Sequence, residues 1–479
     1  MIRTRALATG LCALATLLVV PSALTSGGDK PAIVSIPTPP PADEDAPAGD
    51  PEKGYEFLLY GDYIGGGIPL DIWNATLGAN AGPDPFIERT GMNATIPRTF
   101  TAFTDIHGAD MVAGVNCLGC HASPFGDEYI IGLGNSFADF TPKAPFPTFT
   151  LNAAAALAYP DPQSPERVSL RRFVRGVNAI GRDADTPFRG VNPAFRIEAL
   201  TARYRDPRTL KWQDEPLYEK DAIALATDVP PWWHLKKKHG LYYNGMGRGD
   251  FAKLIQQITV VAIEGEEDAE RIHEGMTDLI AYLRTIEPPA WPRNVDRDLA
   301  AQGRMVFENN CASCHGTYGK GFGDPDWTYP NKVVPVEIVG TDPVYAQTLM
   351  EPRLTEWFNK SWFAVTEPQS RVEPALGYIA PPLDGIWISA PYLHNGSVPT
   401  LEALLDSSKR PTWWRRSFDS KDYDFVRVGW NYEPLDAPAP NDITVYDTTM
   451  PSYGNMGHTF GDDLTDEEHR ALIEYLKTL

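Results

Sequence analysis

The stretch DLAAQGRMVFENNCASCH, residues 298–315, contains the pattern that decides the fold of this 479-residue chain. Apolar residues recur at helical spacing in its first part, so Asp298 to Asn310 is predicted to form an amphipathic helix. This helix leads directly into CASCH, Cys311 to His315. A second copy of the pentapeptide, CLGCH, lies at Cys117 to His121. We therefore expect two sites of the same chemistry in one chain.

The C-x-x-C-H spacing is typical of c-type haem attachment, in which both thiols bind the porphyrin and the adjacent His binds the iron. Disulfides, zinc half-sites and thioredoxin-like redox pairs are the alternatives. A zinc site would need more thiols or a close His pair, and the fifth cysteine, Cys12, lies in the N-terminal apolar stretch. The sequence thus predicts two covalently bound haems, held by Cys117, Cys120, His121, Cys311, Cys314 and His315.

The beginning of the chain predicts export. A short basic region, an apolar run and small residues near Ala23 to Ser26 indicate a signal peptide over residues 1–26. A retained membrane anchor is the alternative, because the apolar run approaches spanning length. We expect a periplasmic or secreted protein with no stable membrane insertion after signal cleavage, which agrees with the attachment of c-type haem outside the cytoplasm.

Residues 27–52 are rich in Pro and acidic residues, so we expect a disordered leader there. The whole chain has 42 basic and 63 acidic residues, a net charge of −21. This excess disfavours binding to nucleic acid or to anionic membranes. It favours a basic, soluble redox partner protein, although solubility alone also explains such a charge.

Each haem motif is followed, after a long variable stretch, by a segment with helical periodicity. These segments are residues 266–286 and 465–479, and they end almost alike, in AYLRTI and EYLKTL. In the second, Thr465 and Glu468 have the spacing of a capping box, which marks a helix start.

The repeated order predicts a mainly α fold of two cytochrome c-type haem domains with long loop insertions. Their predicted bounds are 53–293 and 294–479. The proline-rich EPPAWPR at 287–293 serves as the linker, and the 44 Pro and 40 Gly of the chain fit extensive loops.

The sixth ligand of the second iron has to come from a short set of residues: His394, Met450, Met456, His458 and His469. His394 lies in APYLHNGSVPTL, residues 390–401, where Asn-Gly and Pro predict a turn-rich loop. A His in such a loop can instead hydrogen-bond a haem propionate or cap the helix that follows.

The longer run PPLDGIWISAPYLHNGSVPTLEALL, residues 381–405, resembles the signature of the bacterial di-haem peroxidase superfamily. This superfamily includes cytochrome c peroxidases, the methylamine-dehydrogenase maturation enzyme and haem-dependent rubber oxygenases. The resemblance is closer to the rubber oxygenase-like branch and extends to residues 228–253, 311–319 and 454–479. The first 110 residues carry no part of it.

The resemblance implies a role for His394. In the peroxidases a Met a few helical turns after this His binds the electron-transferring haem, but Thr400 to Pro411 contains no Met. The departure favours the rubber oxygenase pattern, in which the loop His itself binds the second haem. We therefore predict His394 as that ligand. The resemblance also raises a calcium ion between the domains, for which the sequence identifies no residues.

The first haem has fewer candidate ligands, because residues 122–233 contain neither His nor Met. The removable His ligand that the peroxidases usually place soon after this motif is therefore absent. The remaining candidates are His107, Met111, His234, His239 and Met246. We predict a vacant or water-bound sixth position, which would let this haem bind oxygen or peroxide.

Catalytic candidates come from the segment that resembles the family's region between the haems: Trp232, Trp233 and Tyr243. Ordinary core packing is the alternative for each. The sequence thus predicts an exported di-haem oxidoreductase, peroxidase-like or rubber oxygenase-like, with an open first haem and an electron-transferring second haem. The alternative is a non-catalytic electron-transfer cytochrome with both haems six-coordinate.

Overall fold

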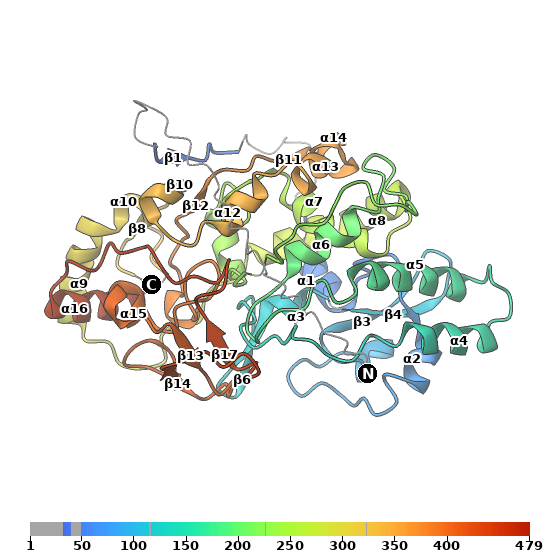
Figure 1. Ribbon diagram of the computed structural model, residues 1–479, viewed down its shortest axis with the longest axis horizontal. Coiled ribbons are helices and arrows are strands. Elements are labelled where there is room, and N and C mark those ends of the chain that lie inside the picture. Colours follow the sequence, from blue (N-terminus) through green and yellow to red (C-terminus); the bar gives the residue numbers. More distant parts are fainter. Residues whose placement is uncertain (1–31, 40–48, 115, 226, 322) are drawn as a thin grey trace, which may run out of the picture.

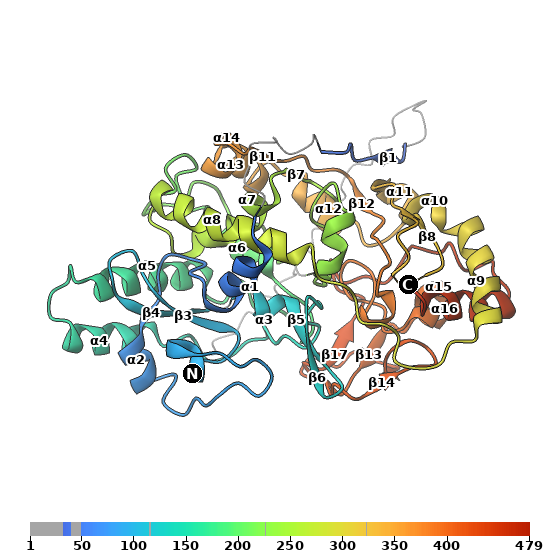
Figure 2. The same cartoon turned by 180° about the vertical axis from the view of Figure 1, so that it is seen from behind.

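The computed structural model describes residues 32–39, 49–114, 116–225, 227–321 and 323–479. The predicted signal peptide and Cys12 lie outside these residues. Figures 1 and 2 show α1 to α8 on one side of the molecule and α9, α15 and α16 on the other. No helix among the described residues combines the length and the apolar character that crossing a membrane requires.

The prediction of a mainly α fold is wrong. Helices make up 36% of the described residues and strands 14%, so the fold is mixed α/β. The strands are short and pair as small antiparallel sheets, such as β2 (Ile68–Pro69), β4 (Asp110–Gly114) and β3 (Phe100–Thr104), with Ala102 opposite Val112. Long loop insertions must still satisfy their buried backbone N–H and C=O groups, and short ladders do so. Strands of two to five residues are too short to show a clear alternating pattern.

Two helix pairs form the scaffold. Helix α1 (Pro51–Tyr60) packs on α8 (Glu266–Leu283), and α9 (Arg297–Asn310) packs on α16 (Asp466–Leu476). At both crossings a glycine lies against the backbone of the partner helix. A Cβ on Gly54 would overlap the carbonyl of Asp278, and one on Gly303 would overlap that of Ala471. The amphipathic helices expected near residues 266, 298 and 465 are thus present, and the capping box of Thr465 and Glu468 is formed.

The hydrophobic cores cross the boundary expected at residue 293. The core around α1 and α8 also contains buried side chains from the second half of the chain, including Tyr345, Phe358 and Phe363. In the other direction, the hairpin of β5 (Ala122–Phe125) and β6 (Glu128–Ile131) follows the first haem motif and inserts Phe125 among second-half aromatic residues. Each motif is therefore surrounded by residues from both halves of the sequence.

Part of the predicted disordered leader forms a strand. Strand β1 (Val34–Ser35) pairs antiparallel with β10 (Lys332–Pro335), and the neighbouring Ile36 is buried. The segment contains the few apolar residues of an otherwise Pro-rich and acidic tract. An open sheet edge supplies the hydrogen-bond partners that such a short segment lacks by itself.

Candidate haem sites

The first C-x-x-C-H motif forms a short helix, α3 (Cys117–His121), anchored by an asparagine. The Asn116 side chain accepts a hydrogen bond from the N–H of Leu118 at 3.0 Å and donates to the carbonyl of Arg98 at 2.8 Å. Across the motif, Asn192 Nδ2 donates to Cys120 Sγ at 2.9 Å. These contacts fix both ends of the motif.

The ring of His121 stacks on Trp232, with ring centres 4.8 Å apart and planes at 18°. Burial lowers the pKa of His121 to about 4, so its imidazole is neutral at physiological pH. The neutral form is the one that binds a metal. The expectation that Trp232 belongs to the first haem site is therefore consistent with its position.

The second motif follows α9 directly and forms α10 (Ala312–His315). Here His315 Nδ1 donates to the carbonyl oxygen of Pro381 at 2.9 Å. That bond orients the ring and leaves Nε2 unprotonated, which is the usual arrangement of a metal-binding histidine.

A second imidazole faces this site. The rings of His315 and His458 have centres 6.2 Å apart and planes at 65°. With metal–nitrogen bonds of about 2.0 Å, two imidazoles on opposite sides of one iron have centres about 6 Å apart. The pair therefore has the spacing that one iron between the two rings requires.

His394, the residue predicted for that role, lies in a tyrosine cluster instead. Its ring stacks on Tyr378 at 4.2 Å, and the ring centres of Tyr345 and Tyr243 lie 6.0 Å and 6.2 Å away. Its carbonyl accepts a hydrogen bond from the N–H of Asp228 at 2.9 Å. The contacts of the described residues thus bring His458, and not His394, to His315.

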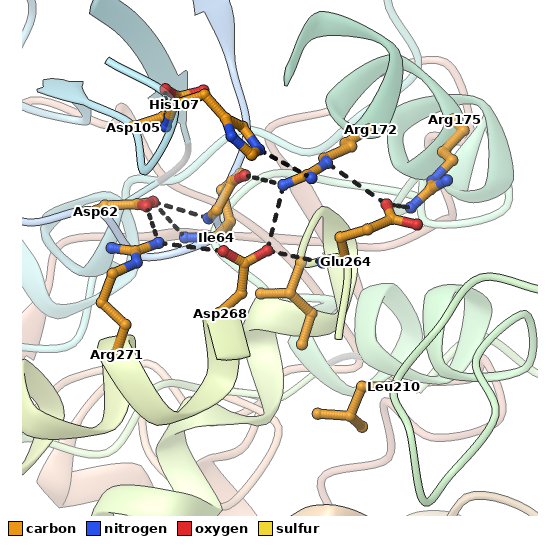
Figure 3. Close-up of polar contacts among 12 residues, drawn as sticks. Asp62, Ile64, Asp105, His107, Arg172, Arg175, Leu210, Glu264, Asp268 and Arg271 are labelled. Carbon is orange, nitrogen blue, oxygen red and sulfur yellow. Dashed lines mark hydrogen bonds and ion pairs between the residues drawn. The ribbon is translucent and has the colours of Figure 1, made fainter. Parts of the chain in front are cut away.

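His107, a candidate ligand for the first iron, belongs to a buried ionic network (Figure 3). Its Nε2 lies 3.4 Å from one guanidinium nitrogen of Arg172. Another guanidinium nitrogen of Arg172 pairs with Asp268 at 3.3 Å. A second pair, Arg271 with Asp62 at 2.7 Å, extends the network. These contacts tie the loops after α1 and β3 to α5 (Pro165–Ile180) and α8, so His107 has a structural role here.

The other histidine candidates for this iron bond to backbone carbonyls. His234 Nε2 contacts the carbonyl of Asp384 at 2.9 Å, and His239 Nδ1 contacts that of Ile36 at 3.2 Å. Both bonds hold the segment around η2 (Trp232–Lys237) against distant parts of the chain.

The two methionine candidates are buried in the first core. Met111 lies in β4 and is fully enclosed, and Met246 is 2% exposed. Each of the five candidates named for the first iron is thus engaged elsewhere in the described structure.

The consecutive tryptophans connect the two sites. Trp232 packs in the first core, whereas Trp233 packs in the second and is completely buried. The indole N–H of Trp233 donates to the carbonyl of Asp384 at 2.7 Å. Asp384 lies three residues after Pro381, whose carbonyl orients His315. This dipeptide therefore spans the space between the two motifs.

Tyr243, the third catalytic candidate, lies beside the half-buried carboxyl group of Asp228. Its hydroxyl donates to Asp228 Oδ2 at 3.3 Å. Burial raises the pKa of Asp228 to about 8, so this carboxyl group holds a proton at neutral pH. Tyr243, Asp228 and His394 form one cluster, with Tyr243 in contact with both partners.

A second carboxyl group with a raised pKa, which no sequence pattern indicates, is that of the half-buried Glu198 on α6 (Ala194–Ala202). Burial raises the pKa of Glu198 to about 8. When ionised, Glu198 raises the pKa of the Cys120 thiol and of the Tyr242 hydroxyl, so it lies near the first motif. Nothing in the sequence marks this residue, because a glutamate within a helix usually faces solvent.

The donor atoms present fit covalent haem. The four motif cysteines form no disulfide in the described structure and are partly exposed. Burial raises the pKa of Cys117 to about 12 and that of Cys311 to about 11, whereas redox-active thiol pairs have a lowered pKa. No group of three or more His, Cys, Asp or Glu among the described residues is arranged for a metal ion, so the calcium expectation finds no site there.

Comparison with protein families defines the class. A cytochrome c family model matches residues 300–360, and a model described as RoxA-like, cytochrome c-like matches residues 377–415. The first range contains Cys311, Cys314 and His315, and the second contains His394. The protein thus has cytochrome c domains with covalently bound c-type haem iron, and these domains indicate an electron-transfer or oxidoreductase role.

Two curated relatives come from Sinorhizobium fredii (strain NBRC 101917 / NGR234). The chain is 30% identical to "Uncharacterized protein y4iJ" over 533 aligned positions, covering 88% of this chain and 85% of that protein. It therefore belongs to the same family as y4iJ. It is also 29% identical to "Uncharacterized protein y4iM", covering 53% of this chain and 65% of that protein.

Proposed function

We propose that this protein is an exported di-haem oxidoreductase in which the two haems have unequal tasks. The haem at Cys311, Cys314 and His315 is six-coordinate and transfers electrons. The haem at Cys117, Cys120 and His121 has a free axial position. The observation that carries the proposal is the asymmetry of the two sites: His315 faces a second imidazole, whereas His121 stacks on an indole.

We assign His458 as the second axial ligand at His315. The ring spacing of 6.2 Å and the orientation of His315 by Pro381 both support this assignment. Two histidine ligands fill the axial positions of a haem iron, which favours electron transfer over substrate binding. The contacts of His394 with the tyrosine cluster do not bring it to His315, so its assignment as the ligand stays a prediction.

When bound at His121, a haem with a free axial position supplies activation of oxygen or peroxide. Two half-buried carboxyl groups of the chain suit such chemistry. Glu198 and Asp228 have a pKa that burial raises to about 8, which keeps a proton available at neutral pH. Tyr243 donates to Asp228 and extends this proton-holding cluster toward His394.

Trp232 and Trp233 provide a route between the sites in this proposal. Trp232 stacks on His121, and Trp233 bonds to the loop that orients His315. Side chains in contact with His121 and with the loop that orients His315 shorten the distance between the haems that an electron has to cross. Membership of the di-haem peroxidase and rubber oxygenase superfamily is part of the proposal, and the RoxA-like match at residues 377–415 supports it.

Periplasmic location and a soluble redox partner also belong to the proposal. The basic and apolar N-terminal residues support export, and the net charge of −21 supports a basic partner. Secretion of a reporter fused to residues 1–26 tests the first point.

Electron paramagnetic resonance of the oxidised protein tests the haem assignment. We expect one high-spin and one low-spin haem, with cyanide converting only the high-spin one. His458→Ala should convert the low-spin signal to high spin, and His273→Ala, on α8 with its Nδ1 3.1 Å from Gln256 Oε1, is the matched control.

Two outcomes would contradict the proposal. A wild-type spectrum with two low-spin haems that ignore cyanide would favour the plain electron carrier. Retention of the low-spin signal in His458→Ala together with its loss in His394→Ala would return the ligand role to His394.

A further inference from the structure

The loop that carries His458 is held by a single arginine, Arg410. A guanidinium has five N–H donors, and in this structure each is directed at a backbone carbonyl. Its Nε donates to the carbonyl of Ala403 at 3.0 Å. One terminal nitrogen donates to the carbonyls of Asn455 at 2.8 Å and Gly457 at 2.6 Å. The other donates to the carbonyls of Leu404 at 2.9 Å and His458 at 3.1 Å.

These five acceptors belong to two segments. Ala403 and Leu404 lie in α15 (Leu401–Leu405), and the other three lie in the loop that ends at His458. Arg410 therefore ties the His458 loop to a helix of the second core. No carboxylate among the described residues forms an ion pair with it, so its charge is directed at these carbonyl dipoles.

The backbone at His458 is in an unfavourable conformation. His458 has φ +47°, in the left-handed region that is unfavourable for a non-glycine residue. Gly457 before it has φ +74° and lies so close to Gly340 that any side chain there would overlap the backbone. On the same side, the N–H of His458 donates to the carbonyl of Val339 at 2.6 Å. Such a conformation persists only where the surroundings enforce it.

The turn APYLHNGSVPTL, residues 390–401, contributes to the same restraint. Asn395 Nδ2 donates to the carbonyl of Gly454 at 2.9 Å, and Ser397 Oγ donates to the same carbonyl at 3.1 Å. Asp342 accepts from the N–H of Gly454 at 3.0 Å. These contacts hold the start of the loop, whereas Arg410 holds its end, next to the imidazole.

We propose that Arg410 is a positioning residue that fixes the His458 imidazole opposite His315, and so determines whether the second haem is six-coordinate. The inference rests on the proposed function, in which His458 is the axial ligand. Lysine cannot replace Arg410, because an ammonium group has three donors on a flexible stem and lacks the planar five-donor arrangement.

The test compares Arg410→Lys and Arg410→Gln with Arg205→Lys in the haem-loaded protein. Arg205 is the matched control, because its guanidinium also donates to backbone carbonyls, but in the first half: those of Leu210, Val260 and Ile263. The readouts are the low-spin resonance of the second haem, its midpoint potential and cyanide binding, with thermal unfolding measured in parallel.

We expect both Arg410 variants to lose most of the low-spin signal, to gain a second cyanide-binding haem and to regain the low-spin signal when imidazole is added. Arg205→Lys should lower the unfolding temperature and leave the spectrum unchanged. The proposal is overturned if the Arg410 variants keep the wild-type spectrum and potential while unfolding earlier. It is also overturned if neither variant yields folded protein, because Arg410 would then be required for folding itself.

His458→Ala separates this inference from the proposed function. If that variant keeps the low-spin signal, the ligand assignment fails, whatever Arg410 does. If His458→Ala loses the signal and the Arg410 variants keep it, only the positioning role fails.

Discussion

His315 and His121 end the same pentapeptide, yet their rings meet different partners. His315 donates to a carbonyl at 2.9 Å and faces His458, whereas His121 stacks on Trp232 with ring centres 4.8 Å apart. The motif itself specifies covalent attachment and one axial ligand. The opposite face is supplied by loops far along the chain, and those loops differentiate the two sites.

The second site is the more rigidly built of the two. Its facing imidazole lies on a loop held by Arg410, Asn395 and Ser397. Near the first site lies the carboxyl group of Glu198, whose pKa burial raises to about 8. A rigid closed site suits electron transfer, and a protonated carboxyl group beside a haem suits reaction with a bound oxidant.

Removal of either cysteine pair gives the largest expected effect. Cys117→Ser with Cys120→Ser should eliminate the high-spin, cyanide-binding haem and leave the low-spin one. Cys311→Ser with Cys314→Ser should do the reverse. Each double variant controls for the other, and the haem content measured as pyridine haemochrome should fall by half in both. Loss of the same spectral component from both variants would remove the distinction between the sites.

The two tryptophans offer a finer comparison. Trp232→Phe should change the high-spin signal and the cyanide affinity of the first haem, because the stacked indole is lost.

Trp233→Phe should leave both signals in place and slow electron transfer between the haems. It should also lower the free energy of unfolding by about 1 kcal/mol, because its hydrogen bond to Asp384 is lost. Stopped-flow reduction and thermal unfolding measure these effects. Equal consequences for both variants would contradict a separate role for each ring.

Local patterns predicted the helices correctly. The amphipathic spacing before CASCH and the capping box at Thr465 are properties of adjacent residues, and the structure has the helices there, including α9 and α16. The fold class could not be predicted this way. Its short strands, such as β2, depend on partners elsewhere in the chain and leave no pattern of their own.

The assignment of His394 as a ligand stays a prediction. Its turn contains Asn-Gly and carries the resemblance, and Asn395 and Ser397 of this turn hydrogen-bond the start of the loop that carries His458. His394 itself turns toward Tyr378, while His458 faces His315. Both histidines were candidates, and only the three-dimensional arrangement of two loops distinguishes them.

The smallest expected effect concerns Glu198 and the pH dependence of stability. A glutamate in an unfolded chain has a pKa of about 4.3, and burial raises the pKa of Glu198 to about 8 in the folded protein. The folded state therefore keeps this proton between those two values while the unfolded state releases it, so stability falls as pH rises from about 4 to about 8.

Glu198→Gln removes the ionisable group and should flatten that part of the profile. The variant should unfold at nearly the wild-type temperature at pH 5 and on the order of a few degrees higher at pH 8.5. Glu356→Gln, at an exposed position paired with Lys360, is the control and should follow the wild type at both values. If Glu198→Gln also follows the wild type, the carboxyl group is ionised and hydrated. The first site would then lack the proton reservoir that distinguishes it from the site at His315.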